Sequence, residues 1–198
     1  MTTVKQIERA WKGRKFERLF RTLAAFRPEA TLSTAPDGGW ATVAAAMAII
    51  RLDELGQSHA AVSPLLIRAM LASQQTDGGW GDLVTTALCV RALLCGHGNG
   101  VAVERGLAYL ANLQKAEGVW PNVPLRRMPE DAGVSALILY ELGDQPAFHA
   151  AVRVDDALAW FMLNEPSLDA ECQALWQRAR LRCQMCGVAH SQVDWLAA

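Results

Sequence analysis

Apolar residues recur along most of the chain with the spacing of amphipathic helices, and almost no segment alternates with a period of two. Glycine, proline and short polar runs separate the apolar segments. The pattern therefore predicts an all-α protein without a sheet. We expect about eight helices, arranged as about four helical hairpins, near residues 4–26, 41–55, 63–75, 83–95, 101–115, 131–142, 153–163 and 167–185.

Three tryptophans follow one another at intervals of forty residues, at Trp40, Trp80 and Trp120. The first two end identical Asp-Gly-Gly-Trp tetrapeptides, and the third ends Glu-Gly-Val-Trp. A fixed turn that recurs at such an interval predicts a helical repeat, in which stacked hairpins bury one another's apolar faces.

Trp160 also falls on the forty-residue count. Residues 154–160, however, align better with residues 103–109 than with a corner. On that alignment Trp160 corresponds to Tyr109 and not to Trp120, so we expect Trp160 inside a helix.

Residues 105–120 resemble the QW motif of squalene and oxidosqualene cyclases, which consists of a basic residue, Gly, an aromatic-Leu pair, Gln and Gly-x-Trp. Residues 74–82 look like a second copy, and residues 37–40 like a degenerate third. The resemblance implies the superfamily that includes class II terpene cyclases and protein prenyltransferase β subunits. There the motifs clamp the outside of an α/α toroid and are not catalytic, so they indicate a fold rather than a reaction.

A complete toroid of this superfamily has six hairpins, whereas this chain is expected to hold about four. The resemblance therefore implies an incomplete α/α barrel, which is either open or completed by another copy or a partner subunit. We expect one α/α-toroid-like domain over residues 1–198, with a basic amphipathic helix at 1–27 and a Cys-containing helix and tail at 167–198.

The net charge is nearly balanced at −1, but residues 1–27 carry eight Lys and Arg against two Glu. A nucleic-acid-binding domain would show a wider basic face, so we exclude that class. The basic helix is compatible with anionic lipid headgroups, with a partner helix, or with a solvated outer helix of the first hairpin. We expect a cytoplasmic protein, at most peripheral to a membrane, because the apolar run 41–50 is too short to span one, no signal peptide is recognisable, and five Cys show no secreted disulfide pattern.

Class II cyclisation begins with protonation by a strong carboxylic acid, which the superfamily supplies from Asp-x-Asp-Asp at the start of a helix. Glu130 and Asp131 lack the first acid but open the helix after a QW segment, and they are our first choice. Asp155 and Asp156 keep the last two acids but follow Arg153, and they are the second choice. The alternative for both pairs is ordinary helix capping, because the helix dipole favours acids in a first turn.

Three candidate metal ligands lie near the C-terminus. Cys183, Cys186 and His190 have a spacing that could bind zinc, and we expect no other cofactor. The competing interpretation is an apolar core face, because buried Cys behaves as a small hydrophobe. That face would consist of Cys172, Trp176, Ala179, Cys183 and Cys186.

Two functions from different classes fit these patterns. The first is binding of an isoprenoid or similar lipophilic chain in an apolar, aromatic cavity, with proton-initiated cyclisation or isomerisation if the protein is an enzyme. The second is a non-catalytic repeat scaffold that binds a protein partner or another copy of itself. An acidic pair inside a closed apolar pocket would favour the first, and a shallow groove with those acids in solvent would favour the second.

Overall fold

The computed structural model of the chain describes residues 38–96 and 100–196, with side chains described between residues 41 and 186 except for the same gap. All of them belong to one compact unit that spans residues 37–198. The basic helix predicted at residues 1–27, and with it the proposed membrane contact, lies outside the described residues.

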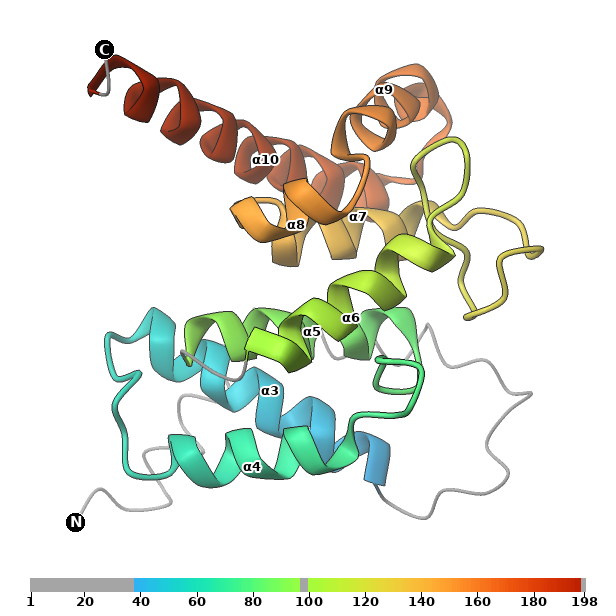
Figure 1. Cartoon of the computed structure of the whole chain (residues 1–198). Helices are drawn as coiled ribbons and strands as arrows, with labels where there is room; N and C mark the ends of the chain where they lie inside the picture. Colours follow the sequence, from blue (N-terminus) through green and yellow to red (C-terminus); the bar gives the residue numbers. More distant parts are fainter. Residues whose placement is uncertain (1–37, 97–99, 197–198) are drawn as a thin grey trace. The chain divides into compact units, whose positions relative to one another are not determined.

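Over the described residues the chain is helical and contains no strand, as the sequence predicts. Two differences from the expected elements stand out. A short helix after residue 145 was not predicted, and the last helix continues beyond residue 185. Figure 1 shows the elements in chain order: α3 (Gly38–Glu54), α4 (Ser63–Ser73), α5 (Leu83–Cys95), α6 (Gly100–Leu113), α7 (Ala132–Leu142), α8 (Pro146–Ala151), α9 (Val154–Asn164), the 3-10 turn η1 (Glu165–Ser167) and α10 (Ala170–Leu196).

The helices of this unit form two layers. In the first layer α3 packs on α5, α5 on α7, and α7 on α10, and at least one other helix separates the two members of each pair in the chain. In the second layer α4 packs on α3, α6 on α5, and α9 on α7 and α10. We call the first the inner layer, because α5 and α7 are buried over most of their length.

The Trp80 corner joins α4 to α5. The Gln74 side chain donates to the carbonyl of Gly78 at 2.8 Å and to that of Ala102, in the first turn of α6, at 2.9 Å. The indole Nε1 of Trp80 donates to the carbonyl of Met70 in α4 at 2.8 Å. The corner therefore closes one hairpin and ties it to the next.

The Trp120 corner, between α6 and α7, repeats these bonds. Gln114 donates to the carbonyl of Gly118 at 2.8 Å and to that of Arg153, at the start of α9, at 3.1 Å. The Trp120 indole donates to the carbonyl of Leu110 at 2.8 Å. In both motifs the Gln amide thus reaches backbone groups that a helix terminus leaves open.

Each corner also needs a glycine at one position. Gly78 and Gly118 have φ values of 93° and 83°, a region that other residues adopt only with strain. A β-carbon on Gly78 would lie 2.5 Å from the carbonyl oxygen of Arg105, and one on Gly118 would lie 2.3 Å from the nitrogen of Ala157. The Trp80 corner therefore packs on the backbone of α6 in the same way as the Trp120 corner packs on that of α9. This supports the sequence alignment of residues 154–160 with residues 103–109.

The unpredicted helix α8 is a single short stretch between α7 and α9. It begins at Pro146, which suits the first turn of a helix. Phe148 is fully buried and stacks against Trp120, with ring centroids 6.2 Å apart. The Nε2 of His149, in the last turn, lies 2.7 Å from the carbonyl oxygen of Gly143 at the end of α7. These contacts hold α8 against the second corner.

Candidate functional site

Glu130, the first candidate acid, lies in the loop before α7 with its side chain 44% exposed. Its carboxylate accepts from the Lys115 ammonium at 3.0 Å. A hydrogen bond from its own backbone and the nearby Lys115 lower its pKa. A lowered pKa keeps this group ionised at neutral pH, which is the state of a surface ion pair and not of a proton donor.

Asp131 caps α7. Its side chain accepts from the backbone amide of Val134 at 2.9 Å, and its own amide donates to the carbonyl of Trp120 at 2.8 Å. Asp82 does the same for α5 in the previous repeat, where it accepts from the amide of Thr85 at 2.8 Å. A capping role shared by two repeats accounts for Asp131 without any chemistry on a substrate.

Asp155 and Asp156 lie in the first turn of α9, and both are exposed. Asp156 forms an ion pair with Arg153 at 3.4 Å, with both side chains about half exposed. Arg153, which occupies the place of the missing first acid, also donates to the carbonyl of Lys115 in the second corner. This pair of acids therefore borders the corner and faces solvent.

The candidate zinc ligands Cys183 and Cys186 are buried on the side of α10 that faces α7. Burial raises the pKa of Cys183 to about 12 and also raises that of Cys186, whereas zinc binds the thiolate. Within the described residues no three His, Cys, Asp or Glu side chains gather as a metal site. The side chain of His190 is not among those described, so the zinc site stays a prediction.

The apolar core face predicted on the same helix is present. The five positions predicted as an apolar core face of α10 are all buried, with exposed fractions of 9% or less. Trp176 among them stacks on Phe161 of α9, with ring centroids 4.5 Å apart. This face attaches α10 to the rest of the unit.

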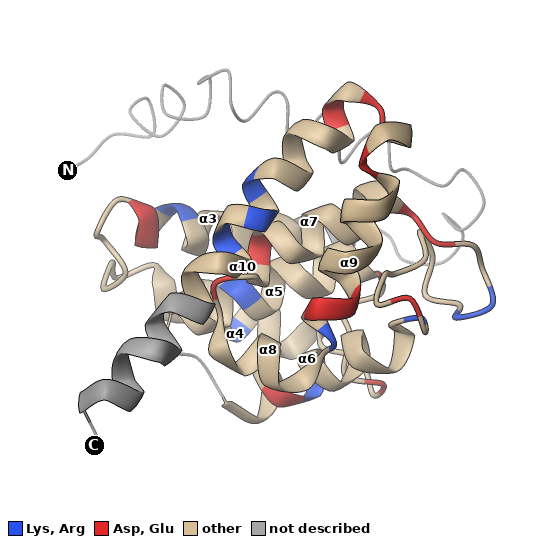
Figure 2. Cartoon of the chain, turned by 90° about the horizontal axis from the view of Figure 1, so that it is seen from above, with Lys and Arg blue, Asp and Glu red and all other residues tan. Residues whose placement is uncertain are grey.

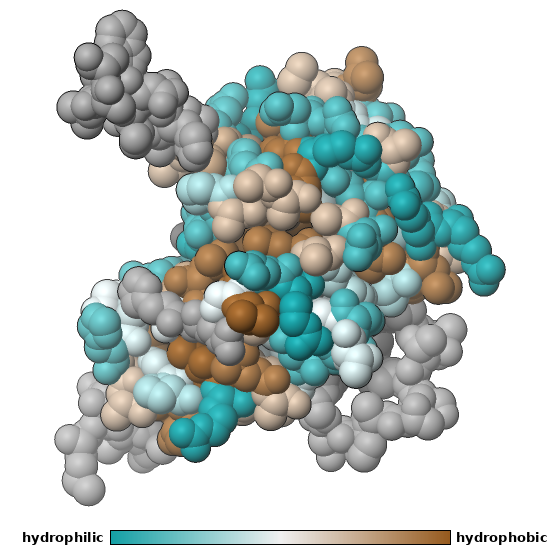
Figure 3. All heavy atoms as spheres, in the orientation of Figure 1, coloured by the Kyte–Doolittle hydropathy of each residue, from teal (hydrophilic) through white to brown (hydrophobic). Residues whose placement is uncertain are grey.

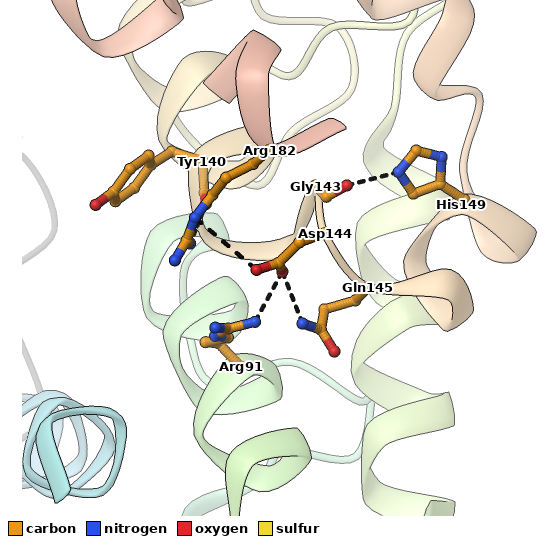
Figure 4. A network of polar contacts seen from close by, with 7 residues as sticks. All are labelled: Arg91, Tyr140, Gly143, Asp144, Gln145, His149 and Arg182. Carbon is orange, nitrogen blue, oxygen red and sulfur yellow. Dashed lines mark hydrogen bonds and ion pairs between the residues drawn. The ribbon is translucent and has the colours of Figure 1, made fainter. Parts of the chain in front are cut away.

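A polar network at the C-terminal end of α7 was not predicted, and Figure 4 shows Asp144 at its centre. The carboxylate of Asp144 accepts from Arg91 of α5 at 2.8 Å and from Gln145 at 2.6 Å. Arg182 of α10 lies 3.9 Å from its other oxygen and 4.6 Å from the ring centroid of Tyr140. The network thus joins three successive helices of the inner layer.

Glu141 is the buried acid beside this network, with only 6% of its surface exposed. Burial is the main cause that raises its pKa, to about 7. The positive charges of Arg182 and Arg91 lower the pKa, and the negative charges of Glu54 and Asp144 raise it further. A carboxyl group that titrates near neutral pH can donate or accept a proton there. Among the carboxyl groups of the described residues, Glu141 is the one whose pKa is raised to about 7.

A signal for this network does exist in the sequence. Arg91 is the single charged residue in the apolar run 87–95. Glu141 is the single charged residue in the run 134–142, which is otherwise apolar except for Ser135 and Tyr140. A single charge in a helix predicted to be buried needs a partner, because an unpaired buried charge is very costly. The Asp-x-Asp-Asp motif that the resemblance implies lies at a helix start, so it predicted acids at such positions and not Glu141.

One pocket lined by described residues, between α6 and α8, is an open groove of about 510 Å³. Alanines and Leu107 line most of it, and Glu104 and Asn112 contribute polar groups. Neither the four candidate acids nor Glu141 belongs to its lining.

Figure 3 shows hydrophobic atoms reaching the surface among hydrophilic ones, and exposed apolar side chains include Leu65 and Val101.

None of the helices in the described part of the chain has the length and apolar character needed to cross a membrane. Comparison with protein-family models, with curated proteins and with solved structures finds no match to this chain. Its function is therefore inferred from its own residues and their arrangement.

Proposed function

We propose that the chain is a non-catalytic helical-repeat scaffold that binds a protein partner, and that its hairpins form an open arc of an α/α toroid. Inner and outer helices alternate along the chain, as a toroid requires. The Trp80 and Trp120 corners make equivalent hydrogen bonds to the following outer helix, so successive hairpins are joined in the same way. A stack of this kind has two ends, and each end needs a polar cap or a partner.

One observation carries the proposal: the last helix of the inner layer has an unpacked apolar side. Leu181 and Met185 of α10 are 62% and 66% exposed. They lie opposite the buried face, because Trp176 and Leu181 are five positions apart on a helix with 3.6 residues per turn. Large apolar side chains in solvent at the end of a repeat stack indicate a binding surface.

The positions of the candidate acids support the same function. Glu130 and Asp156 form ion pairs in solvent, Asp131 caps a helix, and Asp155 is exposed. Proton-initiated cyclisation needs its acid in a dry, enclosed site. The groove described between α6 and α8 is open and holds none of these acids.

A second candidate function is binding of an isoprenoid or similar lipophilic chain, with acid-initiated isomerisation or cyclisation. One observation favours it: Glu141, in the inner layer, is buried and titrates near neutral pH. In this function Glu141 replaces Glu130 as the proton donor. Arg91 and Arg182 beside it weaken the case, because they stabilise the ionised form.

Isolation of the full-length chain from its own cells tests the scaffold. We expect an assembly larger than the 21.6 kDa chain. The double substitution Leu181→Asp and Met185→Asp should release the monomer while leaving the helical circular-dichroism signal unchanged. The double substitution Leu65→Asp and Val101→Asp, at exposed apolar positions on α4 and α6, is the matched control. A monomer in both wild type and control would contradict the scaffold.

A thermal-shift measurement with farnesyl and geranylgeranyl diphosphates separates the two candidate functions. The scaffold predicts no change in Tm with either compound. Stabilisation by an isoprenoid that is lost in Glu141→Gln would establish the second candidate instead. Because binding of a ligand to the folded state must raise Tm, the measurement does not depend on turnover.

A further inference from the structure

We propose that the partner at α10 is a second copy of this chain, packed antiparallel so that Glu171 of each copy pairs with Arg178 of the other. This inference rests on the proposed scaffold function and names its partner. The surface involved, here called the exposed face of α10, consists of Glu171, Ala174, Arg178, Leu181 and Met185.

The exposed face of α10 is a single stripe along the helix. Its members follow one another at steps of three or four residues, which places them on one side. All five are exposed, whereas the residues on the other side pack against α7 and α9. The stripe is therefore available to another molecule along about four turns.

When two copies of the stripe face each other in opposite directions, each negative charge lies opposite a positive charge. Figure 2 shows acidic residues near the beginning of α10 and basic residues in its middle. Glu171 and Arg178 are separated by about two turns, and neither is in an ion pair within the described part of the chain. A two-fold axis near Ala174 would bring each acid opposite the arginine of the other copy, twice. A parallel arrangement would instead bring like charges together.

The small side chain of Ala174 suits the crossing point, because it lets two helices approach closely. On either side of the crossing, Leu181 and Met185 would extend towards the start of α10 in the other copy. That start follows the end of α9, where Met162 and Leu163 are 58% and 82% exposed. The arrangement thus brings Leu181 and Met185 towards a part of the other copy that also carries exposed apolar side chains.

Sedimentation velocity of the purified full-length chain tests this pairing. We expect a dimer that dissociates on dilution from about 100 μM. Glu171→Arg and Arg178→Glu should each raise the dissociation constant by at least about tenfold, because each turns two attractive contacts into repulsive ones. Mixing the two variants in equal amounts should restore a dimer, since one then presents two positive charges and the other two negative charges.

Three controls fix the interpretation. Glu104→Arg changes an equal charge on α6 and should leave the dimer intact. Circular dichroism should show unchanged helix content in every variant, because the two substituted side chains are exposed. The chain that carries both substitutions should dimerise like the wild type, since the charge pattern is only exchanged.

A purified wild type that remains monomeric would overturn the self-pairing. So would single variants that dimerise like the wild type, or a mixture that stays monomeric. A monomeric purified chain that is nevertheless found in a larger assembly in its own cells would overturn only this inference, because the partner would then be another protein. A monomer in both settings would overturn the scaffold function as well.

Discussion

The indole Nε1 of Trp120 donates a 2.8 Å hydrogen bond to the backbone carbonyl of Leu110, ten residues earlier in the chain. Trp80 makes the same bond to Met70 at 2.8 Å. Both carbonyls lie in the last turn of an outer helix, where backbone acceptors lose their helical partners. The repeated tryptophan is therefore a joint that fixes how an outer helix meets the following inner helix.

The first prediction concerns this joint. Trp120→Phe removes the N–H donor from a fully buried site while keeping an aromatic ring, and it should lower the free energy of unfolding by about 1–3 kcal/mol. A urea titration followed by circular dichroism measures this. Trp160→Phe, at a half-buried position on α9, is the control and should cost less than about 1 kcal/mol. Equal losses in the two variants would show that the joint is not a special site.

The second prediction separates backbone conformation from packing at a corner. Gly118→Ala and Gly56→Ala both place a β-carbon at positive φ, at 83° and 67°. That strain costs about 1–2 kcal/mol at either site. The new β-carbon at Gly118 would also lie 2.3 Å from the backbone of α9, whereas nothing lies within 4 Å of the one at Gly56.

We therefore expect Gly118→Ala to lose about 3 kcal/mol or more beyond the loss in Gly56→Ala, because backbone atoms must move apart. Thermal or chemical unfolding of the two variants side by side measures the difference. Matching stabilities would mean that the corner does not sit on α9 as described.

The third prediction is a dependence of stability on pH. The folded-state pKa of Glu141, about 7, lies above its ordinary value of 4.5, so the unfolded chain releases this proton first as pH rises. The free energy of unfolding should therefore fall between about pH 4.5 and 7, by at most about 3 kcal/mol. Urea titrations across this range should show the fall in the wild type and in Glu117→Gln, an exposed control. A fall of the same size in Glu141→Gln would assign it to another group.

The fourth prediction concerns the two buried thiols of α10. If Cys183 and Cys186 serve as core residues, removal of metal with EDTA leaves Tm unchanged, and Cys183→Ala lowers stability less than Cys183→Ser, which buries a hydroxyl group. Metal analysis of the purified chain provides the direct check. One equivalent of zinc that is lost in Cys183→Ser would establish the metal site instead.

The parts of the fold that were predicted correctly depend on interactions close together in the chain. Gln74 and Gln114 bond within their own corners, Trp80 and Trp120 bond ten residues back, and the repeat makes each pair visible twice. Helix α8 was missed because a six-residue helix has too few turns to show a period.

The candidate site was harder to predict for a physical reason. An acid that caps a helix and an acid that opens a catalytic motif occupy the same place in a sequence, and Asp131 shows the capping bond only in three dimensions. The acidity of Glu141 arises from burial and from charges on α3, α5 and α10, which the fold brings together from distant segments. A pattern read along one helix contains neither piece of information.

The central claim is that the chain associates with a second copy of itself through the exposed face of α10, and disulfide trapping tests it most directly. The proposed two-fold axis passes near Ala174, so Ala174→Cys places two thiols close together in the dimer. On mild oxidation we expect a covalent dimer to form rapidly with Ala174→Cys and slowly with Ala116→Cys, an exposed position in the second corner. Equal rates for the two variants, or no covalent dimer from Ala174→Cys, would contradict the claim.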